Sequence, residues 1–199
     1  MWHEDYLIEQ LNRELPGEQA HQNFYPYRNQ LFNTESEKKS AAVGVHIYQR
    51  NNHYFFILIK RPSYHGFHSG QIAFPGGKKD VSDADLVYTA RRESSEELGI
   101  PLKNGKLIRS LTPVYIPVSN FDVQPYIFLH PKMPEMKKNH EVDEIFEVAL
   151  DELLNESNVC KINIRAPKLN DIPAFRFQNC EVWGATALIL SELKELLKR

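Results

Sequence analysis

The sequence predicts an α/β sandwich, in which strands come before, between and after two long helices. One helix is expected at residues 86–98, a stretch without Gly or Pro, and the other at residues 182–198. Around them, short runs rich in Val, Ile, Tyr and Phe alternate with turn residues, as strands do. The 199 residues are typical of one domain, which we divide into residues 1–40 and residues 41–199.

The first forty residues predict a helix followed by a surface segment. Residues 3–15 are amphipathic, and Pro16-Gly17 ends the helix. Its apolar side would hold Leu7, Ile8, Leu11 and Leu15. Residues 18–40 are polar with interspersed aromatic residues and predict an irregular wrap across the domain. This wrap either shapes a substrate pocket or forms a dimer contact, and the sequence does not decide between them.

A β-hairpin is expected next, with strands at residues 41–49 and 53–60. Asn51-Asn52 between them is a turn signal. The second strand is almost continuously apolar, as in a strand buried on both faces. A loop rich in His, Ser and Gly follows, and residues 71–74 predict a short strand before a Pro-Gly-Gly break.

The second half of the chain predicts further strands and a closing helix. Strands are expected at residues 106–114, 122–130 and 144–149, with weaker candidates at 162–164 and 174–177. Residues 131–139 predict a polar excursion, and residues 151–155 a short helical turn. On the final helix, the side chains expected to face the core are Ala187, Leu190, Leu193 and Leu197.

Composition narrows the class of partner. The net charge of −2 gives no sign of a nucleic-acid or anionic-membrane surface. Cys160 and Cys180 are isolated thiols without a disulfide framework, which favours a reducing cytosol. No apolar run approaches the length of a membrane span, and the first ten residues lack the regions of a signal peptide. We therefore expect a cytoplasmic protein.

The helix at 86–98 changes character along its length. Asp83 and Asp85 precede it, where a helix N-terminus favours acceptors. At about 100° per residue, one stripe holds Leu86, Ala90, Glu93 and Glu97. The apolar face that packs on the fold thus runs on into acids.

Glu93, Glu96 and Glu97 are spaced i, i+3 and i+4, so they are neighbours on the helix surface. Clustered acids repel one another, and burial adds a desolvation penalty. A divalent cation relieves both, and oxygen-only ligands suit Mg²⁺ or Mn²⁺. The plainer interpretation of these three residues alone is a solvated acidic cluster at a helix end.

The surrounding residues resemble the Nudix box, G-x5-E-x7-R-E-U-x-E-E-x-G-U, where U is aliphatic. Residues 92–100, RESSEELGI, match its second half, except that Ser94 replaces the aliphatic residue. In the first half, Gly77 is followed by Asp83 instead of Glu, and eight residues instead of seven separate Asp83 from Arg92. The resemblance implies a Nudix-type α/β/α sandwich with a mixed sheet, here with an N-terminal helical extension.

Further segments look like the signature of the coenzyme A pyrophosphatase subfamily of Nudix hydrolases. They are LIKR at 58–61, HSGQ at 68–71, FPGG at 74–77, YIPVS at 115–119, EV at 141–142 and WGATA at 183–187. Two positions depart from the signature, which has Ser or Ala at Pro62 and arginine at Gly66. The resemblance implies hydrolysis of CoA or acyl-CoA to 4′-phosphopantetheine and 3′,5′-ADP.

The resemblance and the acid stripe together assign roles at the acidic end of the helix. Glu93 and Glu97 are the expected metal ligands, with Glu96 third, and Arg92 is expected to orient them by ion pairing. The base that deprotonates water is Glu97 or a downstream acid. The downstream candidates are Glu141 and Glu144.

Other residues are expected to contact the substrate. Arg61 and His68 would face the phosphates, and Gly76 and Gly77 let the backbone turn sharply beside the site. Candidates for stacking on adenine are Tyr64, Phe67 and Trp183, although Trp183 at the start of a core helix is typical of packing.

Three alternatives stay open. A noncatalytic Nudix-like domain would bind a nucleotide without cleaving it. A Nudix-fold isomerase of isoprenoid diphosphates would need its own acid and thiol pair. Within the hydrolases, cleavage of ADP-ribose or dinucleotides is the second choice after CoA.

Overall fold

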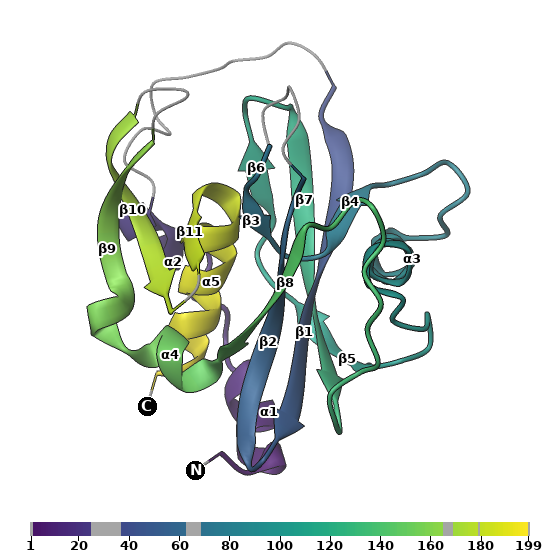
Figure 1. Cartoon of the computed structure of the whole chain (residues 1–199), viewed down its shortest axis with the longest axis horizontal. Coiled ribbons are helices and arrows are strands. Elements are labelled where there is room, and N and C mark those ends of the chain that lie inside the picture. The colour runs from purple at the N-terminus through teal and green to yellow at the C-terminus, as the bar shows by residue number, and fades with distance from the viewer. Residues whose placement is uncertain (1, 25–36, 63–68, 165–168, 179, 199) are drawn as a thin grey trace.

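The computed structural model describes residues 2–24, 37–62, 69–164, 169–178 and 180–198 (Figure 1). The large sheet contains β1 (Lys39–Arg50), β2 (His53–Lys60), β3 (Ile72–Ala73), β4 (Gly76–Lys78), β5 (Lys106–Ser110), β6 (Val114–Ile116), β7 (Phe121–His130) and β8 (Glu144–Ala149). The small sheet contains β9 (Val159–Ile164), β10 (Leu169–Phe177) and β11 (Cys180–Trp183). The helices are α1 (Glu4–Leu11), α2 (Glu18–His21), α3 (Leu86–Leu98), α4 (Leu150–Leu154) and α5 (Gly184–Leu197), with 3₁₀ turns η1 (Gln22–Phe24) and η3 (Glu156–Asn158).

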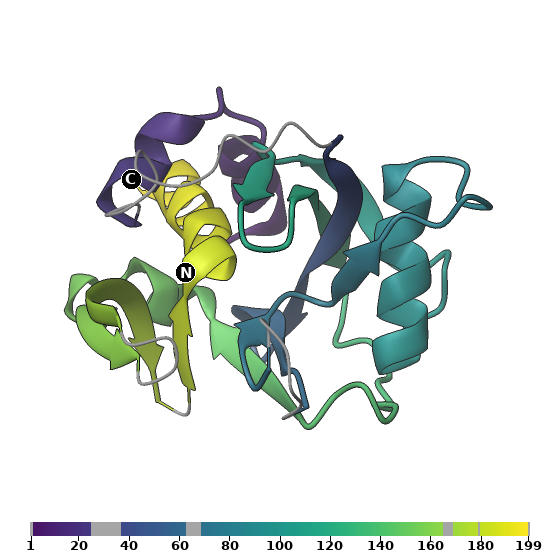
Figure 2. The same ribbon diagram turned by 90° about the horizontal axis from the view of Figure 1, so that it is seen from above.

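The large sheet lies between two helical layers. Its main path is β3-β2-β1-β7-β5, and β4, β6 and β8 pair with β1, β7 and β2. β1 and β7 run parallel while the hairpin strands β1 and β2 run antiparallel, so the sheet is mixed. Figure 1 shows α3 on one face of this sheet and α5 on the other, with the small sheet on the α5 side, and Figure 2 shows the same layers from above. The predicted α/β/α sandwich is confirmed.

The main hydrophobic core lies on the α5 side of the large sheet. The four residues predicted to face it, Ala187, Leu190, Leu193 and Leu197, have no exposed surface. Leu7 and Leu11 of α1 are equally buried and belong to the same cluster. The predicted N-terminal helical extension therefore shares the core of residues 41–199.

The hairpin and the central helix have the predicted form. Asn51 and Asn52 adopt positive φ angles of 52° and 64°, as a tight two-residue hairpin turn requires. α3 spans the expected residues because the Asp85 side chain accepts a 2.7 Å hydrogen bond from the Tyr88 amide. At its other end Gly99 takes the left-handed conformation, with φ of 69°.

Four expectations about element boundaries were wrong. The first helix ends at Leu11, where Arg109 donates to the freed carbonyl of that residue. The strand expected at 106–114 divides into β5 and β6, because Pro113 has no N–H and the Thr112 amide donates to Glu192 instead.

The other two concern short elements. The segment 18–40 begins with α2 and η1 rather than irregular chain, and residues 25–36 lie outside the described residues. The last helix begins at Gly184, not at residue 182, because the preceding four residues pair with β10 as β11. Such a short strand depends on a partner elsewhere in the chain.

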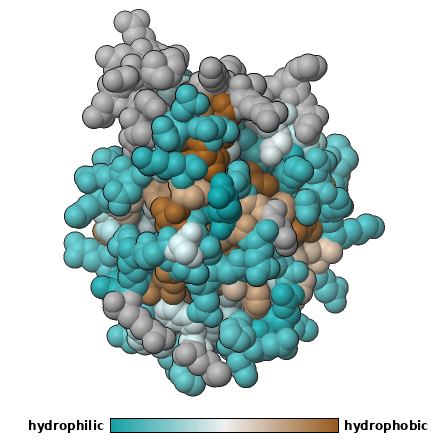
Figure 3. Space-filling view, turned by 60° about the vertical axis from the view of Figure 1, so that its left-hand side comes forward, coloured by the Kyte–Doolittle hydropathy of each residue, from teal (hydrophilic) through white to brown (hydrophobic). Residues whose placement is uncertain are grey.

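The surface of the small-sheet side mixes polar and apolar side chains, which Figure 3 shows as interrupted brown areas among teal. Within the described residues, no helix has both the length and the apolar character needed to cross a bilayer.

Candidate active site

The first half of α3 packs on the large sheet through apolar contacts. Ala90 is fully buried against Ala42 of β1 and Phe128 of β7. This packing fixes which side of the helix faces the sheet. Because Glu93 and Glu97 continue the stripe of Ala90, they are carried toward the sheet as well.

The strand β4 lies beside these acids, and its first two residues are glycines in close contact with their neighbours. Gly76 has a φ of 154°, and a Cβ there would lie 2.3 Å from the carbonyl oxygen of Ala42. A Cβ on Gly77 would lie 2.6 Å from the carboxyl carbon of Glu93. The Glu93 carboxylate therefore rests directly on the backbone of β4.

Glu97 is buried, with 2% of its surface exposed. It accepts a 2.9 Å hydrogen bond from the Gly76 amide, and Nη1 of Arg61 lies 3.9 Å from its other oxygen. Burial raises the pKa of Glu97 to about 7, while the Arg61 charge and the Gly76 hydrogen bond act in the opposite direction. The carboxylate is thus only partly compensated by its surroundings.

Glu93 and Glu96 share one cationic partner. Nη1 of Arg92 donates to Glu93 at 2.8 Å and to Glu96 at 3.0 Å. Burial raises the pKa of Glu93, and the hydrogen bond from Arg92 opposes that shift. Glu96 is the exposed member, with 52% of its side chain accessible.

Arg92 is held in turn by Asp83. Its Nε and Nη2 donate to the two oxygens of Asp83 at 2.9 and 3.0 Å, which keeps the pKa of that carboxyl well below its usual range. Asp83 also accepts from the Thr89 hydroxyl and the Asp80 amide. Asp83 is therefore the anchor of Arg92, whereas Asp85 is the helix cap.

The structure separates the two downstream acids. The exposed Glu141 lies near the acids, because its amide donates to the side chain of Asn139 and the Asn139 amide donates to the Glu97 carbonyl. After burial, its charge adds to the raised pKa of both Glu93 and Glu97. Glu144 pairs opposite Lys60 in β8, on the same side of the sheet as Phe146 of the main core. The charge of Glu144 acts instead on Cys180 of the small sheet. This placement favours Glu141 over Glu144, which was chosen for the catalytic set, as the downstream acid.

The remaining predicted residues divide between the site and other places. Nη2 of Arg61 donates to the Gly76 carbonyl at 2.8 Å, so Arg61 borders the acids. Trp183 packs in a cluster of the small sheet with Ile162 and Ala174. His68 lies outside the described residues, as do Tyr64, Gly66 and Phe67.

The fit to a divalent cation rests on the chemistry of the donors. In the described part of the chain, no three His, Cys, Asp or Glu side chains are already gathered around a common metal position. The acids nevertheless supply only oxygen, and Glu97 is a buried carboxylate that accepts an N–H from Gly76. Gly77 leaves space for the Glu93 carboxylate against the backbone. These features suit a hard cation such as Mg²⁺ or Mn²⁺.

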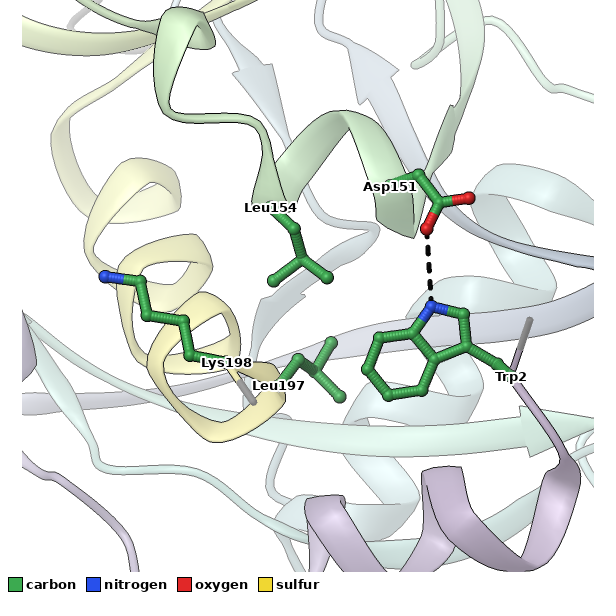
Figure 4. A pocket seen from close by; sticks show the side chains of 5 residues that line it. All are labelled: Trp2, Asp151, Leu154, Leu197 and Lys198. Atoms are coloured by element: carbon green, nitrogen blue, oxygen red, sulfur yellow. Dashed lines mark hydrogen bonds between the residues drawn. The ribbon is translucent and has the colours of Figure 1, made fainter.

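A hollow of about 380 Å³ lies at the C-terminal end of α5, away from the acids of α3 (Figure 4). Trp2 and Asp151 on its wall are joined by a 3.4 Å hydrogen bond, and Lys198 pairs with Glu195 and Glu156. The polar groups of this hollow are already paired within the protein, so they do not form a set of hydrogen-bonding groups that point together at a ligand.

Comparison with known proteins agrees with the fold. Residues 38–165 match the NUDIX domain family. An uncharacterized Nudix hydrolase, NudL, of Yersinia pestis (strain Pestoides F) is 33% identical over 141 residues, which cover 70% of each protein.

Two solved structures are similar in fold alone. RenU, a Nudix hydrolase from M. smegmatis, has a TM-score of 0.57 at 17% identity, covering 81% of this chain and 91% of that one. The NUDIX domain of Shewanella oneidensis NrtR, complexed with ADP ribose, has a TM-score of 0.54 at 14% identity, covering 89% and 99%.

Proposed function

The chain belongs to the NUDIX domain family, and from this premise we propose that it is a metal-dependent hydrolase of a nucleoside diphosphate linkage. One observation carries the proposal. Glu97 is a buried, partly compensated carboxylate beside Glu93, at a glycine strand that leaves room for both. A buried acid of this kind is costly to a fold, and functional sites are where such groups gather.

The residues divide the work as follows. Glu93 and Glu97 would hold Mg²⁺ or Mn²⁺, with Glu96 as a third ligand. A cation held there would neutralise charge on the diphosphate and lower the pKa of the attacking water. Arg92, anchored on Asp83, orients Glu93 and Glu96. Glu97 or Glu141 accepts the proton of the water.

We assign the substrate to CoA or acyl-CoA on the signature at 58–61, 68–71 and 74–77. Arg61 in that signature borders the acids and is proposed to contact a phosphate, as is His68. The backbone of Gly76 and Gly77 would lie beside the same group. Cleavage within the diphosphate would give 4′-phosphopantetheine and 3′,5′-ADP.

Cleavage of ADP-ribose or a dinucleotide is the second candidate. Gly66 stands where the CoA signature has arginine, which removes a possible fork contact to phosphate. If that arginine only strengthens substrate binding, Gly66→Arg lowers KM for CoA.

The isomerase alternative is disfavoured by the thiols. Cys160 and Cys180 lie on β9 and β11 of the small sheet, on the α5 side of the molecule, whereas the acids lie on the α3 side. Burial raises the pKa of the Cys180 thiol to about 12. Neither thiol is paired with the acid stripe.

A substrate panel tests the proposal. The protein is incubated with Mg²⁺ and CoA, ADP-ribose, NADH or dNTPs, and the products are identified by chromatography. Glu93→Gln, purified in the same way, controls for contaminating hydrolases. We expect CoA to be cleaved fastest. Faster turnover of ADP-ribose or NADH overturns the CoA assignment, and nucleotide binding without turnover identifies a noncatalytic domain. The cytoplasmic location and the homodimer stay predictions.

A further inference from the structure

A buried polar chain crosses from α3 into the large sheet. The Ser94 hydroxyl lies 2.8 Å from Nε2 of His46 in β1, and Nδ1 of His46 lies 2.9 Å from Nε2 of His130 in β7. Ser94 also donates to the Ala90 carbonyl at 2.7 Å. The exposed fractions of the three linked residues are 1%, 1% and 3%. These linked side chains thus join one helix to two strands by direct hydrogen bonds.

Two glycines make room for this chain. A Cβ on Gly44 would lie 2.6 Å from Nε2 of His46 and 3.0 Å from the Ser94 hydroxyl. A Cβ on Gly105 would lie 2.8 Å from Nε2 of His130. Any side chain at Gly44 would displace the hydrogen-bonded atoms, so the neighbouring backbone is shaped to admit them.

The chain occupies a position where the Nudix box has an aliphatic residue. An aliphatic side chain would fill this space by packing alone, without any polar partner. Ser94 instead requires His46, and His46 requires His130, because each buried polar group is costly when unpaired. Compared with an aliphatic residue, Ser94 also fixes the orientation of α3 relative to the sheet, because hydrogen bonds restrict angles that apolar contacts leave free.

The direction matters because of where Ser94 sits on the helix. At about 100° per residue, Arg92 and Ser94 lie on opposite sides of Glu93, and Glu97 lies roughly 40° from Glu93, between it and Ser94. One side of the acid stripe is held by Arg92 on Asp83. Ser94 on His46 holds the other side. Together the two anchors restrain rotation of α3 about its axis.

Both imidazoles are held in the neutral form. Burial, followed by the charges of His130 and then Arg91, lowers the pKa of His46. Burial, followed by the charge of Arg91, lowers the pKa of His130 to about 4. Arg91 stacks over Phe128, which in turn stacks on His46. A neutral pair needs one proton in the nitrogen–nitrogen contact, so the chain is a set of ordinary hydrogen bonds at neutral pH.

We propose that Ser94, His46 and His130 are positioning residues that aim Glu93 and Glu97 at Gly76 and Gly77. This inference rests on the proposed function, because it names what holds the proposed ligands in place. It predicts that loss of the hydrogen bonds among these three residues lets the acid stripe rotate while α3 itself stays folded.

The hydrogen bond from the Gly76 amide to Glu97 depends on the position of Glu97, so it can be used to test the proposal without metal or substrate. Amide exchange at Gly76 is measured by NMR in wild type, Ser94→Ala, His46→Leu and His46→Gln. We expect about tenfold faster exchange in Ser94→Ala and His46→Leu, and recovery in His46→Gln, whose amide can replace Nε2.

The matched control is Ser191→Ala on α5. Ser191 is also buried and donates 2.7 Å to a carbonyl of its own helix, but it lies on the opposite face of the sheet. Its loss should lower stability without changing exchange at Gly76. In the CoA assay, Ser94→Ala and His46→Leu should lower kcat about tenfold with KM for CoA unchanged, since they disturb the proposed metal ligands and not the substrate contacts.

Exchange at Gly76 that matches wild type in folded Ser94→Ala and folded His46→Leu overturns the inference, and so does an equal effect of Ser191→Ala. If wild type cleaves no nucleotide, the proposed function fails, while the exchange measurement still decides whether the chain positions the acids. If His46→Leu does not fold, the test is the comparison of amide exchange at Gly76 between Ser94→Ala and Ser191→Ala.

Discussion

Each of the two long helices carries a buried glutamate, and the two glutamates are treated very differently. Glu192 of α5 is 0% exposed and Glu97 of α3 is 2% exposed. Glu192 accepts hydrogen bonds of 3.1 Å from the Gly17 amide and of 2.8 and 2.6 Å from the amide and hydroxyl of Thr112. From the described residues, Glu97 accepts one, from the Gly76 amide, and has Arg61 at 3.9 Å.

The difference separates a structural acid from a candidate ligand. Glu192 uses both of its oxygens to tie Gly17 and Thr112 to α5, which fastens the N-terminal segment to the domain. Glu97 keeps acceptor capacity that the described residues do not use. Because burial without full compensation is unfavourable, the fold gains nothing evident from Glu97 unless a cation or proton joins it.

Removal of metal should give the largest difference between the acids of α3 and Glu192 of α5. We expect nucleotide hydrolysis to be lost in chelator and recovered with Mg²⁺ or Mn²⁺. Added Mg²⁺ should also raise the melting temperature of wild type, since it binds the folded state alone. Glu192→Gln should keep this response to Mg²⁺. Activity that survives exhaustive chelation would show that the acids of α3 serve another purpose.

The pH dependence of stability should come from the α3 side. Burial raises the pKa of Glu97 from 4.5 to about 7, so the folded protein binds more protons than the unfolded chain between these values. The stabilisation is complete below pH 4.5 and is lost as the pH rises through about 7.

Metal-free wild type should therefore lose on the order of 2–3 kcal/mol of unfolding free energy, relative to Glu97→Gln, between about pH 5 and about pH 8. Urea unfolding at both pH values measures it. Parallel pH profiles for the two proteins would contradict the raised pKa.

On the α5 side, we expect Glu192→Gln to lower the free energy of unfolding by about 1–3 kcal/mol. Its two oxygens face the amides of Gly17 and Thr112, so either orientation of the new side chain sets an NH₂ group against a backbone N–H. Denaturant unfolding measures the loss, and kcat of the folded variant should equal that of wild type. A stability within experimental error of wild type would mean that Glu192 is not a structural anchor.

The two glycines of β4 sharpen the comparison at a smaller scale. Alanine at Gly77 would meet the end of the flexible Glu93 side chain, which can move aside. We expect Gly77→Ala to lower kcat about tenfold, or about 1.4 kcal/mol, with little change in stability. Gly76→Ala is the control, because its Cβ would meet the Ala42 backbone and should chiefly destabilise the fold. The same effect in both variants would count against a role for Glu93 placement.

Local signals were enough to predict α3 and the hairpin. Asp85 and Gly99 bound the helix, and Asn51-Asn52 supplies the turn, all within a few residues of the element they define. β11 was missed because four residues become a strand only by pairing with β10. The split between β5 and β6 depends on Glu192, which is 80 residues away from Thr112.

The acid stripe was likewise predictable, because its spacing lies within one helix. The choice between Glu141 and Glu144 was not, although strand alternation offered a signal, since Glu144 shares a face with Phe146. The partners of Ser94 lie in other strands, so the polar chain appears only in three dimensions. The one sequence signal for it was a serine where the Nudix box has an aliphatic residue.

The most direct test of the central claim is the stability of metal-free Glu97→Gln, measured with its turnover. The substitution removes one of two neighbouring buried charges, so at about pH 5 we expect the metal-free variant to be as stable as wild type or more stable by about 0.5–1.5 kcal/mol, a margin that should widen as the pH rises. Turnover should fall by roughly 10²-fold or more, and Mg²⁺ should raise its melting temperature less than that of wild type. A variant that is destabilised without metal yet still turns over substrate would make Glu97 a structural residue like Glu192.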